Sequence, residues 1–118
     1  MEKVKAYTDI VQSKKLAEIL PLESADMWFA NGLIVAKTSK EPNDIKGVFP
    51  CWSLTALLDI LPKRIEIVDN VYELSIYLYG IYYWNTINGN LCFKSKDKDN
   101  LVDACYEAIV FLHEQKLL

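Results

Sequence analysis

The residues of this chain that could perform chemistry are few, and they do not fall at catalytic spacings. The single histidine, His113, is followed by Glu114–Lys116, which indicates an exposed helix end rather than a general base beside a nucleophile. Cys51 directly precedes a predicted helix, whose N-terminus could lower the pKa of the thiol; packing beside Trp52 is the alternative. We therefore expect no catalytic residue, and we predict that the protein is not an enzyme.

The sequence also lacks the patterns of metal and cofactor sites. Cys51, Cys92 and Cys105 show no paired spacing of the kind used by metal or redox sites. Asp103 and Glu107 lie one helical turn apart, as metal ligands can, but no histidine shares their face. All four glycines fall in predicted turns or loops, so we find no glycine-rich phosphate loop. We therefore predict no metal site and no cofactor.

Length and composition limit the class of protein. The 118 residues predict a single domain (1–118), and the net charge of −3 argues against a general nucleic-acid binder, because no basic excess can displace phosphate counterions. The odd cysteine count favours reduced thiols over a disulfide framework. The charged start and the lack of a long apolar run predict neither a signal peptide nor a membrane helix. We expect a cytoplasmic protein without membrane contact.

Three helices are predicted to frame these residues. The first covers about residues 11–20 and ends at Pro21. The second follows Ser53, a plausible N-cap, and ends before Pro62. The third covers about residues 99–116, with Asn100 as a candidate cap. Its core-facing stripe is predicted to be Leu101, Ala104, Cys105, Ala108, Ile109 and Leu112.

An N-terminal hairpin is predicted over Met27–Ala36. Asn31 and Gly32 tolerate the positive φ angles that a two-residue hairpin turn needs. The resulting register pairs Phe29 with Ile34, Trp28 with Val35, and Asp26 with Lys37. Residues 38–47 are rich in turn formers and predict a polar loop.

Arg64–Ser95 predicts a four-stranded antiparallel meander. A two-residue turn at Asn88-Gly89 would place Trp84 opposite Phe93. For the preceding turn, a two-residue loop at residues 79–80 would mix the faces, whereas a three-residue loop at 78–80 places Leu74 beside Trp84. We expect the second register, with a further turn near residues 69–70 that sets Ile65 against Leu74, Ile67 against Tyr72 and Glu66 against Glu73.

This register assigns each side chain of the meander to one of two faces. Helices should cover the inner face and water the outer one, which predicts a two-layer α+β fold. The predicted inner face is Ile65, Ile67, Leu74, Ile76, Tyr82, Trp84, Leu91 and Phe93. The predicted outer face is Glu66, Glu73, Ser75, Tyr77, Tyr83, Asn85 and Lys94.

Two surfaces are left as candidate contact sites. The hairpin is apolar on both sides, so its outward side chains and one residue of the last helix form a candidate protein interface, unless residues 38–49 fold over them. That interface consists of Trp28, Ala30, Leu33, Val35 and Val110. The second surface is a candidate ligand face for single-stranded nucleic acid or a flat small molecule, which tyrosines can stack. It consists of Tyr77, Tyr83, Asn85 and Lys94. The alternative is that tyrosine simply favours strands, and the acidic charge makes nucleic acid the less favoured ligand.

Three segments carry a family resemblance. Residues 20–27, 50–54 and 99–107, with the ending Leu112–Lys116, resemble a set of small uncharacterised proteins from bacterial genomes, often in prophage or mobile-element neighbourhoods. These segments cover about a quarter of the chain. The resemblance implies a phage-related origin but brings no activity, cofactor or catalytic residue. Together with the apolar hairpin, it leads us to predict a non-enzymatic accessory protein that binds another protein or forms a homodimer.

Overall fold

The computed structural model describes residues 5–30, 33–36, 48–96 and 99–118, and it confirms an α+β fold. Two antiparallel sheets are present, one of three strands in the order β2-β1-β3 and one of four strands in the order β4-β5-β6-β7. The elements are α1 (Ile10–Ile19), the 3₁₀ helix η1 (Leu22–Ser24), β1 (Met27–Ala30), β2 (Leu33–Ala36), β3 (Val48–Cys51), α2 (Leu54–Ile60), β4 (Arg64–Ile67), β5 (Asn70–Tyr77), β6 (Gly80–Trp84), β7 (Leu91–Lys94) and α3 (Leu101–Glu114).

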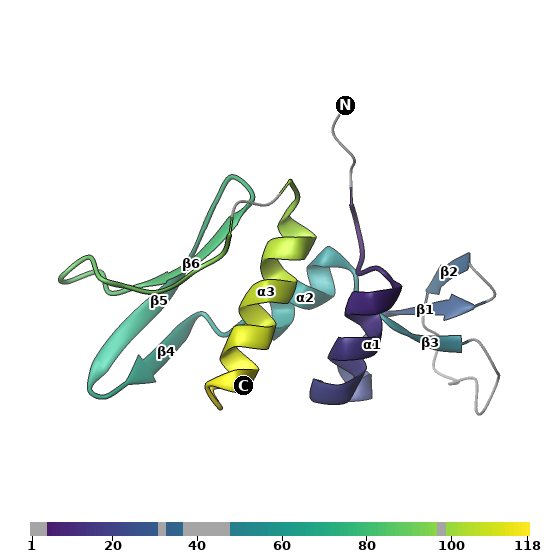
Figure 1. Ribbon diagram of the computed structural model, residues 1–118, viewed down its shortest axis with the longest axis horizontal. Helices are drawn as coiled ribbons and strands as arrows, with labels where there is room; N and C mark the ends of the chain where they lie inside the picture. The colour runs from purple at the N-terminus through teal and green to yellow at the C-terminus, as the bar shows by residue number, and fades with distance from the viewer. Residues whose placement is uncertain (1–4, 31–32, 37–47, 97–98) are drawn as a thin grey trace.

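The two sheets lie at opposite ends of the molecule, with the helices between them (Figure 1). α3 lies against one face of the four-stranded sheet, α2 packs on α3, and α1 lies between these two helices and the three-stranded sheet. The shape is elongated, with principal extents of 50 × 36 × 20 Å. Each sheet therefore has its own helical neighbours.

Capping residues fix where the helices begin. Asp9 and Gln12 form a reciprocal capping box at the start of α1, in which Asp9 Oδ1 accepts from the Gln12 backbone N–H and Gln12 Oε1 accepts from that of Asp9. The predicted caps of the other two helices are confirmed. Ser53 Oγ accepts from the Ala56 N–H, and Asn100 Oδ1 accepts from the Asp103 N–H.

The first hairpin has the predicted register. Phe29 pairs with Ile34 and Trp28 with Val35. β3 was not predicted, and it adds to the other edge of β1 so that Trp28 lies opposite Pro50. The predicted Asp26–Lys37 pair, the turn residues 31–32 and the loop 38–47 lie outside the described residues.

The predicted registers of the meander are wrong, although its four strands are present. β5 and β6 are joined by the two-residue turn 78–79, so Leu74 lies beside Tyr83 rather than Trp84. Leu78, not Gly80, has the positive φ, at 56°. Between β6 and β7 a bulge pairs Tyr83 with Phe93 and Trp84 with Leu91.

The turn between β4 and β5 also differs from the prediction. Val68 and Asp69 both have positive φ, which shifts the pairing so that Ile65 lies opposite Tyr72 and Ile67 opposite Asn70. Glu73 then faces Arg64 instead of Glu66, and the two form an ion pair at 3.2 Å. The expected like-charge pair is therefore replaced by an opposite-charge pair.

These shifts exchange two neighbouring aromatic residues between the faces. Tyr83 is fully buried and its Oη donates to the Pro62 carbonyl at 2.6 Å, whereas Trp84 is 37% exposed. The assignment to faces is therefore wrong for five residues: Tyr82, Trp84 and Leu91 lie on the outer face, and Tyr83 and Asn85 on the inner one. It is right for Ile65, Ile67, Leu74, Ile76 and Phe93 on the inner face and for Glu66, Glu73, Ser75, Tyr77 and Lys94 on the outer face.

Candidate functional site

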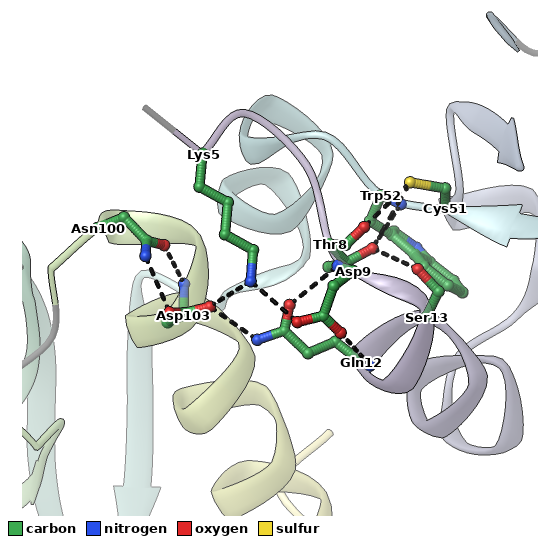
Figure 2. A network of polar contacts seen from close by, with 9 residues as sticks. All are labelled: Lys5, Thr8, Asp9, Gln12, Ser13, Cys51, Trp52, Asn100 and Asp103. Carbon is green, nitrogen blue, oxygen red and sulfur yellow. Dashed lines mark hydrogen bonds and ion pairs between the residues drawn. The ribbon is translucent and has the colours of Figure 1, made fainter. Parts of the chain in front are cut away.

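Cys51 lies in a closed polar cluster that disfavours nucleophilic chemistry. Its thiol is fully buried beside Thr8, whose hydroxyl lies 3.7 Å from the sulfur and 2.7 Å from the Ser13 hydroxyl (Figure 2). Burial raises the pKa of Cys51 despite these hydrogen bonds. Since the thiolate is the reactive form, this environment disfavours Cys51 as a nucleophile. His113 is exposed at the end of α3.

Burial has the same effect on the other two thiols. It raises the pKa of Cys92, and it raises that of Cys105 to about 12. All three cysteines are thus held as protonated thiols at neutral pH.

Asp103, considered above as a metal ligand, instead joins two helix starts. Its Oδ1 accepts from Lys5 Nζ at 2.7 Å and from Gln12 Nε2 at 2.8 Å, and its Oδ2 accepts from Asn100 Nδ2 at 2.8 Å (Figure 2). Lys5 also contacts Asp9, at 3.1 Å. The start of α1 is therefore tied to the start of α3.

These contacts move the pKa values of both partners. Partial burial alone would raise the pKa of Asp103, but hydrogen bonds from Lys5, Gln12 and Asn100 outweigh it and lower the pKa. Burial alone would lower the pKa of Lys5, and its bonds to Asp103 and Asp9 raise it instead. Within the described residues, no group of His, Cys, Asp and Glu side chains is placed to hold a metal ion.

The candidate hairpin interface is not fully exposed. Trp28, its largest side chain, is only 7% exposed and lies on the central strand β1, opposite Pro50 of β3. Leu33 is exposed, while Ala30 and Val110 are half-buried. The side chain of Val35 lies outside the described part of the structure. The expected outward position of Trp28 is therefore corrected.

The candidate ligand face is divided between the two sides of the sheet. Tyr77 and Lys94 are exposed on the outer side, as expected. Tyr83 is buried against the helices, and Asn85 is 6% exposed with its Oδ1 accepting from two loop N–H groups. These four residues therefore do not form one surface.

Another set of residues does form one surface. Trp84 lies between Glu73 and Leu91 in one row across the strands, and Tyr82 lies between Ser75 and Lys94 in the next. No described element covers this side of the sheet (Figure 1). We call this surface the open sheet face; its apolar and aromatic members are Val71, Tyr77, Tyr82, Trp84 and Leu91.

Gly80 shapes the aromatic part of the open sheet face. A Cβ atom at Gly80 would lie 2.8 Å from Tyr82 Oη and 2.9 Å from a carbon of its ring. The end of the Tyr82 ring therefore rests on the bare backbone of Gly80, beside Tyr77. A glycine in a strand often marks such a close approach.

The open sheet face carries equal numbers of acidic and basic side chains. Glu66 and Glu73 are acidic, and Arg64 and Lys94 are basic. Arg64 and Glu73 are already paired with each other. The surface is therefore neutral overall and lacks the positive groove that nucleic-acid binding needs.

A shallow pocket lies elsewhere, between residues 23–26 and 55–60. Its volume is about 550 Å³, and its lining includes Glu23, Asp26 and Asp59. The Asp26 carboxylate already accepts hydrogen bonds from the backbone and hydroxyl of Ser53, where it supports the start of α2. Part of this acidic lining thus has a structural role.

Comparison with known proteins found no matching family model, no matching curated protein and no matching solved structure. The resemblance to prophage-associated proteins therefore stays a prediction. Among the described helices, none is both long and apolar enough to cross a bilayer.

Proposed function

We propose that this protein acts by binding another protein through the open sheet face, without catalysing a reaction. The observation that supports this most is the exposure of Trp84 in the middle of that face. A sheet with one face on helices usually has polar residues on its other face. Here, Tyr77 and Leu91 are more than half exposed as well.

The residue types also favour a protein partner. Tryptophan and tyrosine are enriched in protein interfaces and contribute much of their binding energy, whereas lysine and glutamate are depleted from interface centres. Trp84 and Tyr82 lie on the central strand β6, and Arg64 and Lys94 lie on the edge strands β4 and β7. Glu73, on the other central strand, has its charge paired with that of Arg64. An aromatic centre with a charged rim is the usual arrangement of such a surface.

The two surfaces predicted from the sequence are less suited to this role. In the hairpin, burial of Trp28 removes the side chain expected to contribute most. For stacking a base or another flat ligand, Tyr83 is not available because its ring is enclosed in the core.

Site-specific photo-crosslinking tests the proposal. A benzophenone amino acid replaces Trp84, or in a matched control Lys15, which is exposed on α1 at the far side of the helices. In irradiated cells that express the protein, we expect discrete adducts from position 84 that are absent from position 15. Equal adduct patterns at both positions, or no adduct at either, would overturn the proposal.

A further inference from the structure

We infer that the partner bound by the open sheet face is a second copy of this chain, related by a two-fold axis. This inference rests on the proposed function and specifies its partner. A two-fold contact brings the same surface of both copies together, so the surface must be complementary to itself. Charge, shape and size of the open sheet face each bear on that requirement.

The charges meet the requirement because both signs are present in equal number. Arg64 and Lys94 of one copy have Glu66 and Glu73 of the other as possible partners, and no excess of one sign repels the second copy. A surface of a single sign would disfavour self-association, since facing like charges are destabilising. The neutral face therefore fits a copy of itself better than it fits a strongly charged partner.

The shape meets it because the open sheet face is one side of a four-stranded antiparallel sheet, and sheets commonly pack face to face. Two such faces pack about 10 Å apart, with their inward side chains interdigitated. In this protein the helices lie on one side of the sheet only (Figure 1). A second sheet on the other side would complete a helix–sheet–sheet–helix stack and cover Trp84, Tyr82 and Leu91.

The size implies a reversible dimer. The strands lie about 4.8 Å apart and have four, eight, five and four residues at about 3.3 Å each, which gives a footprint of roughly 330 Å². Standard protein interfaces bury roughly 800 Å² of accessible surface per partner. Although the accessible area of a side-chain surface exceeds its flat footprint, the open sheet face is smaller than a standard interface and falls in the size range of weak, transient contacts. Association should therefore depend on protein concentration.

A charge-swap experiment on the full chain tests the inference. Lys94→Glu gives the face three acidic and one basic side chain, and Glu66→Lys gives it three basic and one acidic. Both positions are exposed, so neither change should unfold the protein. By sedimentation over a concentration series, we expect wild type to approach twice the 13.6 kDa chain mass, and each variant alone to show a dissociation constant raised about tenfold or more.

The mixture of the two variants is the deciding sample. Because their faces carry opposite net charge, we expect mixed dimers to form at concentrations where either variant alone is monomeric. Leu33→Thr, an exposed change on the other sheet, should leave wild-type association unchanged. A wild type that stays monomeric at the highest concentration, or a mixture no more associated than its components, would overturn the inference.

The outcome separates this inference from the proposed function. Adducts at position 84 with a protein other than this chain, together with a monomeric purified protein, would contradict the second copy and leave protein binding in place. Absence of adducts together with a monomeric protein would contradict both.

Discussion

The two sheets of this protein use their tryptophans in opposite ways. Trp28, in the central strand of the three-stranded sheet, is 7% exposed, whereas Trp84 in the four-stranded sheet is 37% exposed. The small sheet also directs Phe29 and Phe49 toward the N-terminal segment, where Tyr7 meets Phe29 edge to face at 6.3 Å and Lys14 lies 5.7 Å from the Phe49 ring. The large sheet packs one face on helices and presents aromatic side chains on the other. Among the described residues, the larger sheet therefore leaves its tryptophan more exposed than the smaller sheet does.

The largest expected difference in stability is between substitutions at two adjacent residues on opposite faces of β6, Tyr83 and Trp84. We expect Tyr83→Ala to lower the free energy of unfolding by about 3–5 kcal/mol, because it leaves a cavity in the core and an unpaired Pro62 carbonyl. The matched change Trp84→Ala should cost less, about 1–2 kcal/mol, since more than a third of that residue is exposed. Urea unfolding of both variants checks this. Similar losses for the two would show that the faces are wrongly assigned.

A second prediction concerns the hydrogen bonds of Asp103 that tie the start of α1 to the start of α3. Asp103→Ala should lower stability at neutral pH by about 1–2 kcal/mol, because it removes an acceptor shared by Lys5, Gln12 and Asn100. Glu114→Gln, an exposed change on the same helix, should have little effect at neutral pH. Urea unfolding of the two variants at pH 7 is the measurement, and equal losses would contradict the role of the network.

The same network sets a pH dependence. The lowered pKa of Asp103 means that its contribution is present above the unfolded pKa of about 4 and is lost as pH falls through the folded value. The raised pKa of Lys5 means that its contribution is present below about pH 10.4 and is lost at higher pH. Wild type should therefore lose more stability than Asp103→Ala between pH 5 and strong acid. A constant difference between the two across that range would contradict the lowered pKa.

The smallest predicted change in stability concerns the turn between β4 and β5 in the four-stranded sheet. Val68 has a φ of 47° with an exposed side chain, a conformation unfavourable for a β-branched residue. Because Asn suits the first position of a two-residue turn with both φ values positive, Val68→Asn should stabilise the protein by about 0.5–1 kcal/mol in thermal or urea unfolding. Val71→Asn, three residues on in β5, should not stabilise it. A destabilising Val68→Asn would contradict the turn geometry.

The sequence predicts strand registers and helix starts correctly where the turn or cap residues have a clear chemical signature. The Asn31-Gly32 signature gave the correct register of the first hairpin, and Ser53 and Asn100 marked helix starts as their side-chain chemistry requires. The turns at Val68-Asp69 and Leu78-Tyr79 contain no glycine. The prediction therefore places the second turn over residues 78–80, where Gly80 is the nearest residue that favours a positive φ. In fact Gly80 lies in β6 under the Tyr82 ring.

Errors in register carried over directly into the candidate site. A shift of one residue moves every side chain to the other face, so Tyr83 was expected outside and Trp84 inside. The alternation of Ile81 and Tyr83 is present in the sequence, but tyrosine and tryptophan suit either face. In the structure Tyr83 is buried in the core and its hydroxyl donates to the Pro62 carbonyl. β3 was missed because Pro50 is uncommon in strands and is tolerated here at a sheet edge.

The exposure of Trp84 on the open sheet face can be measured by acrylamide quenching of tryptophan fluorescence in dilute protein. All three tryptophans are placed, and Trp52 and Trp28 are buried, so the account predicts one quenchable, red-shifted component from Trp84. In Trp84→Phe that component should disappear and leave blue-shifted emission that resists the quencher. If Trp84→Phe keeps the quenchable component, the outer side of the large sheet is not the exposed aromatic surface, and the proposal built on it fails.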